Sequence, residues 1–416
     1  MRRILVGIAL LLVPLTALAQ SDEGGIDLVD VSGPLDASAI EFMTQSIMEA
    51  AAAGQELIVL QINSKAALDS DALNDLMLTI DRPPIPVAIW VGPAPAAAYG
   101  GIAQLVLNAS EKSIAPGSEI GLALPTVAGD PAAPLLIDES LVEGYEGVVV
   151  AGDTDLELQP TIRQYLQDLN GRTFLTVEGP VVVETVEEFT QDGEAGVTIK
   201  TVTFIKPGLG LRFFRLGVTP EAAFFFLVVG LSIISFEFFA IGPGVAAAFG
   251  ALSLLIAGWG VVNLPVQWWA LTLAISGWIL LTVSYQKGGV IAFTGLGAVM
   301  LQIGGMFFID GSGQIDARWW LILPSVLAVL FFFVLAMPTV QRARFSTQVL
   351  GREGLVGASG VALVDFDPDG LVEVNNARWR ATAHREAGIA RGSAVMVTGV
   401  DGLFLEVEPI SSEREN

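Results

Sequence analysis

This 416-residue chain offers few residues of the types that most often act as nucleophiles, bases or metal ligands. The chain has no cysteine and one histidine, His384, which excludes disulfide frameworks, thiolate metal sites, a cysteine nucleophile and a cluster of several histidines. A serine hydroxyl is a poor nucleophile without a neighbouring base. One set with suitable spacing is Lys112 with Ser110, Ser113 and Ser118. We favour the alternative that Ser113 and Ser118 are ordinary polar residues beside the Pro116–Gly117 turn.

Acidic side chains offer two further hypotheses. Asp153, Asp155 and Glu157 could supply oxygen ligands to a divalent cation, but a solvated acidic face is the more common outcome. We therefore predict no metal ion and no cofactor. Glu237 lies in an apolar stretch, where a carboxylate is costly unless it is paired or near an interface. Its sequence position is compatible with both an interfacial side chain and an ion pathway.

The composition indicates a membrane protein with one unusually acidic region. The chain is 52% hydrophobic and 16% charged, against roughly 25% charged residues in soluble domains. Residues 21–200 contain 29 acidic and 6 basic residues, so this region alone carries the whole net charge of −23. Such an acidic chain lacks the basic footprint of a general nucleic-acid binder. The acidic region is expected to occupy a different compartment from the rest.

The N-terminal half predicts a leader followed by an α/β domain. Residues 1–20 combine two arginines, an apolar run and a small-residue end, which predicts a secretory signal peptide, with an uncleaved anchor as the alternative. Strand-like and helix-like patterns then alternate, which predicts βαβ units and a parallel sheet. The predicted strands are 26–31, 56–62 and 86–91, and the predicted helices are 36–53, 68–79 and the Ala-rich 93–109.

The pattern changes after residue 125. Residues 126–157 are rich in Gly, Pro and acids, which indicates a surface excursion, and 159–170 predict a short helix. Three strand-like runs then predict a small β annex: 173–178, 181–186 and 197–205.

Five apolar stretches then predict about five membrane-spanning helices, because each approaches the roughly 20 residues needed to cross hydrocarbon. These stretches are 220–240, 244–262, 266–284, 288–308 and 318–337. An exported N-terminal domain puts Lys287, Arg342, Arg344 and Arg352 on the cytoplasmic side, as the positive-inside rule prefers. Lys206, Arg212 and Arg215 disagree with this orientation, which we keep because of the leader.

The C-terminal module, residues 345–410, reads as a separate domain followed by a tail at 411–416. Short alternating runs separated by dense turns, such as Asp367–Gly370 and Asp401–Gly402, predict a five-stranded OB-like barrel. His384 lies in this module, beyond the apolar stretches, so it cannot join exported serines in a Ser-His-Asp site.

This order of parts resembles the long membrane-bound form of the NfeD family. The residues that carry the resemblance are Gly351–Gly357, Gly370–Val372, Trp379–Ala381, Ile389–Val395 and Val400–Leu405 in the barrel, Glu237 with Gly242–Gly244, and Ile114–Gly121. The resemblance implies an exported ClpP/crotonase-like serine protease domain over 21–219, transmembrane helices over 220–340 and a cytoplasmic OB-fold. Active members are expected to use a serine in an A-A-S-A-G pattern, a lysine base and a T-P-G-G oxyanion segment.

The sequence departs from that pattern at all three positions. Ala97–Gly101 reads AAYGG, so Tyr99, or Gly100 if the gap moves, stands where the serine is expected. The oxyanion segment reads Asn63-Ser64-Lys65-Ala66-Ala67, and no lysine occurs between Lys112 and Lys200. Tyr99 is expected to pack its ring near the domain surface, with a role in blocking or lining the cleft as the alternative.

The sequence therefore predicts a membrane-anchored scaffold with an inactive protease-like domain. The resemblance implies a stomatin/flotillin-like (SPFH) membrane partner and a possible homo-oligomer, in the inner membrane of a bacterial cell. The barrel is expected to bind protein and not nucleic acid, because it is acidic overall and has few aromatic residues. Two alternatives stay open, an active membrane-bound serine endopeptidase that cleaves a hydrophobic partner segment and a transport protein that uses Glu237.

Overall fold

The computed structural model describes residues 24–191, 194–240, 244–345, 353–383 and 387–410. The chain divides into two compact units, Met1–Thr339 and Val340–Asn416. The predicted leader and the His384 position lie outside the described residues.

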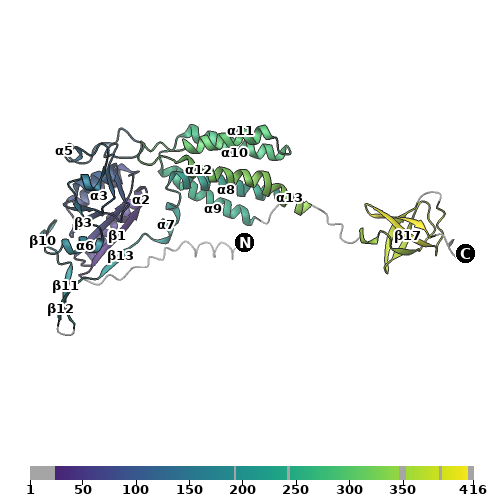
Figure 1. The fold of residues 1–416 in the computed structure, drawn as a ribbon, viewed down its shortest axis with the longest axis horizontal. Coiled ribbons are helices and arrows are strands. Elements are labelled where there is room, and N and C mark those ends of the chain that lie inside the picture. Colours follow the sequence, from purple (N-terminus) through teal and green to yellow (C-terminus); the bar gives the residue numbers. More distant parts are fainter. Residues whose placement is uncertain (1–23, 192–193, 241–243, 346–352, 384–386, 411–416) are drawn as a thin grey trace. The chain divides into compact units, whose positions relative to one another are not determined.

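A parallel sheet of six strands forms the centre of the N-terminal domain (Figure 1). Its order is β13-β1-β2-β3-β5-β8, and every neighbouring pair is parallel. The strands are β1 (Ile26–Ser32), β2 (Leu57–Asn63), β3 (Val87–Val91), β5 (Glu111–Ile114), β8 (Glu157–Leu158) and β13 (Val202–Ile205). The predicted parallel βαβ architecture is confirmed.

Helices cover both faces of this sheet because its central strands are apolar on both sides. The larger core, with Ile40, Leu60 and Ile89, lies beneath α2 (Ala37–Ala52), α3 (Ser70–Asp81) and α4 (Gly101–Asn108). The opposite core contains Trp90, Tyr165 and Phe174 and is covered by α6 (Ile162–Asp168). Asp69 caps α3 by accepting the Ala72 N–H at 2.9 Å, whereas Asp36 precedes α2 without a side-chain cap.

The predicted helix over 93–109 is wrong in its first half. Residues 97–99 form strand β4 (Ala97–Tyr99), and only Gly101–Asn108 are helical. β4 pairs with β6 (Glu119–Gly121), which in turn pairs with β7 (Val148–Val150) from the acidic excursion. These long-range pairings override the helix preference of the alanine-rich sequence. The excursion also holds α5 (Glu139–Val142) and a 3₁₀ turn, Ala151–Asp153.

The predicted β annex is two hairpins, and its last strand belongs elsewhere. One hairpin is β9 (Thr173–Thr176) with β10 (Gly179–Val182), and the other is β11 (Val186–Gln191) with β12 (Glu194–Ile199). β13 is not part of the annex, because it joins the main sheet in parallel beside β1. A short helix, α7 (Leu209–Arg215), leads from there to the apolar helices.

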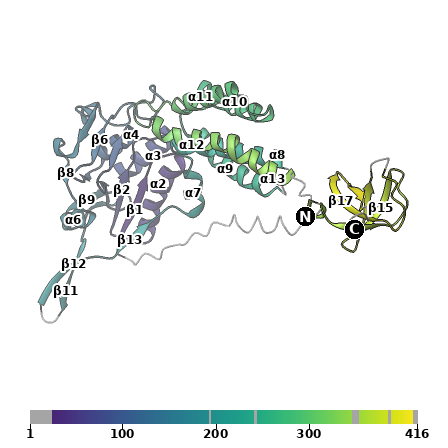
Figure 2. The same cartoon turned by 45° about the vertical axis from the view of Figure 1, so that its right-hand side comes forward.

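Five apolar helices follow, and they run back and forth beside the N-terminal domain (Figures 1 and 2). They are α8 (Pro220–Ala240), α9 (Val245–Asn263), α10 (Trp268–Gln286), α11 (Ile291–Met306) and α12 (Trp319–Phe331), which continues through a π-helical turn, Phe332–Ala336, into α13 (Met337–Phe345). Four of them are long and apolar enough to cross a membrane, the last as Trp319–Val340. All five predicted apolar stretches are helical, and α11 is the short one, because its 16 residues extend only about 24 Å.

The C-terminal unit is a closed five-stranded barrel in the order β14-β15-β16-β18-β17. Its strands are β14 (Ser359–Ala362), β15 (Asp369–Val374), β16 (Ala377–Thr382), β17 (Ala394–Asp401) and β18 (Phe404–Pro409). Alternate residues such as Val372, Val374, Leu405 and Val407 fill its interior. The predicted five-stranded barrel is confirmed.

Candidate functional site

The candidate site lies where β4 turns into α4. Gly100 makes this turn with φ 61° and ψ −137°, a conformation that costs a residue with a side chain about 1–3 kcal/mol. A strained strand–turn–helix is the geometry in which many hydrolases present a nucleophile. Of the two positions that the sequence leaves open, the structure places Gly100 in this conformation and Tyr99 at the end of the strand.

A side chain from a distant loop covers Gly100. A Cβ atom at this position would lie 2.6 Å from Oε1 and 2.8 Å from Nε2 of Gln314, which comes from the connection between α11 and α12. Gln314 is 4% exposed, and its Nε2 donates to the Pro125 carbonyl at 2.8 Å. Its Oε1 is buried, and none of the described residues donates a hydrogen bond to it. The space in front of the turn is therefore filled by an amide that belongs to the chain itself.

The backbone donors at the turn already have acceptors. The N–H of Gly100 donates to the Leu122 carbonyl at 3.0 Å, and the N–H of Gly101 donates to the Thr126 carbonyl at 2.7 Å. In hydrolases with this turn, the N–H that follows the nucleophile helps to stabilise the oxyanion. Here the segment 122–126 takes up both donors.

The segment expected to form the oxyanion site is also occupied by the chain's own backbone. Ala67 accepts the Ala128 N–H at 3.0 Å and forms a parallel bridge with Val127. Ala66 accepts the Leu35 N–H at 2.9 Å, and Ser64 Oγ donates to the Ala66 carbonyl at 3.1 Å. Ser64, Ala66 and Ala67 are buried, whereas Lys65 is exposed.

Tyr99 packs its ring beneath the exposed Lys65 and is itself buried. Its residue exposure is 6%, its hydroxyl donates to the Glu119 carboxylate, and Lys65 Nζ lies 5.6 Å from the centre of its ring. Burial raises the pKa of the Tyr99 hydroxyl, and the Glu119 carboxylate adds to the shift. A neutral phenol bound to a carboxylate serves here as a packing group.

The structure separates Lys112 from the serines of the alternative set. Lys112 and Ser113 are successive residues of β5, so their side chains point to opposite faces of the sheet. Lys112 Nζ donates to the Leu107 carbonyl, and burial lowers its pKa. Ser113 is fully buried, and Ser118 Oγ accepts the Ala96 N–H at 3.1 Å. No described contact joins a serine hydroxyl to this amine.

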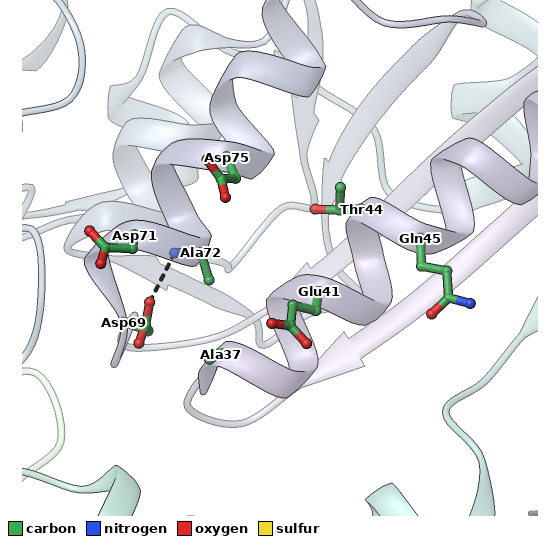
Figure 3. A pocket seen from close by; sticks show the side chains of 8 residues that line it. All are labelled: Ala37, Glu41, Thr44, Gln45, Asp69, Asp71, Ala72 and Asp75. Atoms are coloured by element: carbon green, nitrogen blue, oxygen red, sulfur yellow. Dashed lines mark hydrogen bonds between the residues drawn. The ribbon is translucent and has the colours of Figure 1, made fainter.

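Acidic residues line a groove of about 510 Å³ between α2 and α3 (Figure 3). Its carboxylates are Glu41, Asp69, Asp71 and Asp75. In the cluster considered as an alternative cation site, Glu157 pairs with Arg172 at 2.9 Å. Among the described residues no three His, Cys, Asp or Glu side chains are placed to hold a metal ion.

Glu237 lies near the end of α8, and its carboxylate accepts the Gly244 N–H at the start of α9. This contact gives the acid a local role in the turn between two helices.

Sequence reasoning missed a buried polar group behind the candidate site. Gln104, fully buried in α4, donates to Thr126 Oγ1 and to the Ala123 carbonyl at 2.8 Å each, and it accepts the Leu136 N–H at 3.1 Å. This group ties the acidic excursion to α4. The position of Gln104 as the one polar side chain within an apolar helical run indicates a buried polar contact. No local pattern indicates the role of Gln314, because its neighbours are about 190 residues away in the sequence.

The membrane and barrel regions decide the family. Residues 221–337 match the pattern of the NfeD integral membrane domain, and residues 352–409 match that of the NfeD-like C-terminal, partner-binding domain. The chain belongs to the NfeD family. It is a membrane protein of the long form, with a parallel α/β N-terminal domain and a closed, OB-like barrel.

Two relatives of this NfeD protein match most of its length. It is 22% identical over 390 residues to the Membrane-bound protease PH1510 of Pyrococcus horikoshii, covering 85% of this chain and 86% of that protein. It is 23% identical over 407 residues to the Membrane protein NfeD1b of Bacillus subtilis, covering 91% of each. A solved structure, the 1510-N membrane protease specific for a stomatin homolog from Pyrococcus horikoshii, covers 47% of this chain and 98% of its own, with 17% identity and a TM-score of 0.37.

Proposed function

We propose that this NfeD protein is a membrane-anchored scaffold whose N-terminal domain keeps a protease-like fold without serine protease activity. The observation that carries the proposal is the turn at Gly100, which has no hydroxyl and is covered by the Gln314 amide. The N–H groups of Gly100 and Gly101 support it, because both donate to the chain's own carbonyls. A substrate carbonyl would have to displace these contacts before reaching the site.

The missing base gives independent support. The family resemblance implies a lysine beyond the turn, but the chain has none between Lys112 and Lys200. Lys112 donates to a helix carbonyl, and Lys200 pairs with Glu56. Neither amine is described in contact with residues 97–101, so neither is placed to act as the base that a serine at this turn would need. Lys65 Nζ, which is near, lies over the Tyr99 ring.

A fluorophosphonate probe tests the proposal on the purified full chain. We expect no covalent labelling under conditions that label a known serine hydrolase in the same sample. The competing function is an active endopeptidase that cleaves a hydrophobic partner segment. Labelling that is lost in Ser64→Ala, Ser113→Ala or Ser118→Ala would overturn the scaffold proposal and identify the nucleophile.

The barrel is proposed to bind a stomatin/flotillin-like membrane protein. The match of residues 352–409 to a partner-binding domain supports binding of a protein. The 1510-N protease is specific for a stomatin homolog, which is the class of partner that the resemblance implies. Crosslinking in native membranes, followed by mass spectrometry of the adducts, tests this. Recovery of an SPFH protein through barrel residues is expected, and adducts formed only through the N-terminal domain would contradict it.

The same proposal assigns a place to each part of the chain. Residues 1–20 are a signal peptide, 21–219 form the exported domain, 220–340 lie in the inner membrane, and 345–410 form the cytoplasmic barrel, with a tail at 411–416. A homo-oligomer formed through the N-terminal domain belongs to this proposal.

A further inference from the structure

The segment that leads from the sheet to the first membrane helix, residues 204–216, differs in charge from the acidic region before it. It contains Lys206, Arg212 and Arg215 and no acidic residue. By contrast, residues 21–200 carry a net charge of −23. These three cations are also the ones that disagree with the positive-inside rule. A local reason is therefore needed for their position.

Arg215 has such a reason inside the protein. Its guanidinium lies 3.3 Å from Oδ1 of the fully buried Asp36 and donates to the carbonyls of Ser32 and Pro34 at 3.1 and 3.0 Å. The next residue back, Phe214, packs its ring on Trp259 of α9 at 5.3 Å between centroids. This side of α7 therefore joins the N-terminal domain to the membrane helices.

The other side of α7 is exposed and mixes apolar and basic side chains. Leu209 is 75% and the adjoining Leu216 is 52% exposed, and Arg212 lies between them on the same side of the helix. Phe204, which precedes α7, is 58% exposed. In the described part of the chain, Lys206 and Arg212 form no ion pair and no side-chain hydrogen bond.

This exposed side lies at the level where the apolar helices begin. Gly217 packs against the backbone of Ile256 and Gly260, within the last two turns of α9. Figures 1 and 2 show α7 running across the direction of the membrane helices. The exposed Trp268 and Trp319 mark the same ends of α10 and α12, as aromatic residues do at membrane interfaces.

We propose that residues 204–216 bind the surface of an anionic phospholipid bilayer. Leu209 and Leu216 enter the boundary between headgroups and acyl chains, while Lys206 and Arg212 contact lipid phosphates. Short segments with this mixture of side chains bind membranes through buried apolar area and attraction to anionic lipid. Anionic headgroups would also pair these two cations, which otherwise lie without a partner among the described residues beside the apolar helices.

Because the chain has no cysteine, one introduced cysteine gives a unique label. Full-length protein carrying Leu209→Cys with an environment-sensitive fluorophore is placed in nanodiscs of phosphatidylcholine alone or mixed equally with phosphatidylglycerol. Quenching by brominated acyl chains of either lipid then reports proximity and lipid preference. Leu175→Cys, 71% exposed on β9 away from α7, is the matched position control.

We expect the label at 209, and not at 175, to be quenched, with brominated phosphatidylglycerol the better quencher. Lys206→Gln and Arg212→Gln should each reduce that preference by about fivefold, the weight of one cation at such a surface. Arg82→Gln, which removes another exposed cation of the domain, should leave it unchanged. The proposal would be overturned if the label at 209 were not quenched, or if the preference for phosphatidylglycerol survived the double substitution. It would also be overturned if the label were quenched only when the protein self-associates, because a second copy of the chain would then cover this surface.

Discussion

At the scale of single residues, Gly100 and Gln314 define a site whose backbone suits a nucleophile while its neighbour excludes one. The backbone at Gly100 has φ 61° and ψ −137°, which glycine adopts at low cost. The Gln314 amide then lies where any side chain at this position would begin. A side chain at position 100 would overlap this amide, so the two positions should be energetically coupled.

Gly100→Ser should therefore lower the free energy of unfolding by about 3 kcal/mol, from backbone strain and from overlap with Gln314. Adding Gln314→Ala should recover about 1 kcal/mol by removing the overlap, although the strain remains. Thermal or denaturant unfolding of the four proteins in the double-mutant cycle measures this coupling in full-length protein in detergent.

Gly117 supplies the control for that cycle. It also has a positive φ, 82°, but a Cβ atom there would meet nothing within 4 Å. Gly117→Ser should lose stability through backbone strain alone and show no coupling to Gln314→Ala. Equal coupling at both glycines would mean that the Gln314 contact does not explain the sensitivity of Gly100.

A second residue-scale prediction concerns Asp27 on β1. Its residue is 4% exposed, Oδ1 has no hydrogen-bond partner, and burial raises its pKa to about 6. The folded protein therefore keeps a proton that the unfolded chain releases near pH 4, so this group makes stability fall as the pH rises from about 4 to about 6. Asp27→Asn should remove that fall and raise stability at neutral pH by about 2–3 kcal/mol.

The measurement is the difference in unfolding free energy between Asp27→Asn and the original protein across this pH range. Asp30→Asn on the same strand serves as the control, because Asp30 is only half-buried and accepts a long hydrogen bond from Gln61. A difference that stays constant from pH 4 to pH 7 would show that Asp27 ionises normally in the folded protein.

At the scale of elements, the sequence predicts those helices and strands whose position depends on the local pattern of apolar residues. The apolar runs of β1, β2 and β3 and the helix-like patterns of α2 and α3 are sufficient to locate them within a few residues. The prediction failed where distant pairing decides the outcome. Residues 97–99 are alanine-rich and helix-like in isolation, yet they pair with 119–121. β13 likewise pairs with β1 across more than 170 residues, which no local pattern encodes.

The candidate site divides in the same way. The missing serine, lysine and Pro-Gly-Gly segment could be recognised from the sequence, because each is a departure from a short motif. The filling of the site could not, because it depends on loops 122–128 and 310–315 arriving from elsewhere in the fold. The preferred position for the absent nucleophile, Gly100, also depends on a backbone angle and not on residue type.

The hairpin of α10 and α11 allows a prediction at this scale. A Cβ atom at Gly277 would lie 2.7 Å from the Gly297 carbonyl oxygen, and one at Gly297 would lie 2.8 Å from that of Gly277. Small residues allow membrane helices to approach this closely. Gly277→Ala and Gly297→Ala should each destabilise the bundle by about 1–3 kcal/mol, because the two backbones must separate.

Gly295, two residues before Gly297 in α11, provides the matched comparison, because a Cβ atom there would meet nothing within 4 Å. Gly295→Ala should be neutral or slightly stabilising, since alanine is the better helix former. Unfolding of each variant by SDS in mixed micelles gives the ranking. Three equal midpoints would contradict close packing of α10 on α11.

At the scale of the whole molecule, the connections between the apolar helices indicate on which side of the membrane each helix begins and ends. The α9–α10 connection meets the α11–α12 connection, where Val266 pairs with Ile309 and Asp310 N–H donates to the Pro265 carbonyl at 3.0 Å. Gln314 and Ser312 of the latter connection contact the N-terminal domain. Both connections therefore lie on the side of that domain, whether or not the short α11 crosses the bilayer completely.

The barrel should consequently face the compartment opposite to the N-terminal domain. α8 leads away, α9 returns, the α10–α11 hairpin leaves and returns as a unit, and α12 leads away for the last time. Single cysteines at Leu175 and at Leu403 in the barrel, each 71% exposed, are equally accessible in the folded chain. In intact cells a membrane-impermeant maleimide should modify Leu175→Cys and not Leu403→Cys, and both should react after permeabilisation. Modification of both, or of neither, in intact cells would show that α12 does not carry the chain across.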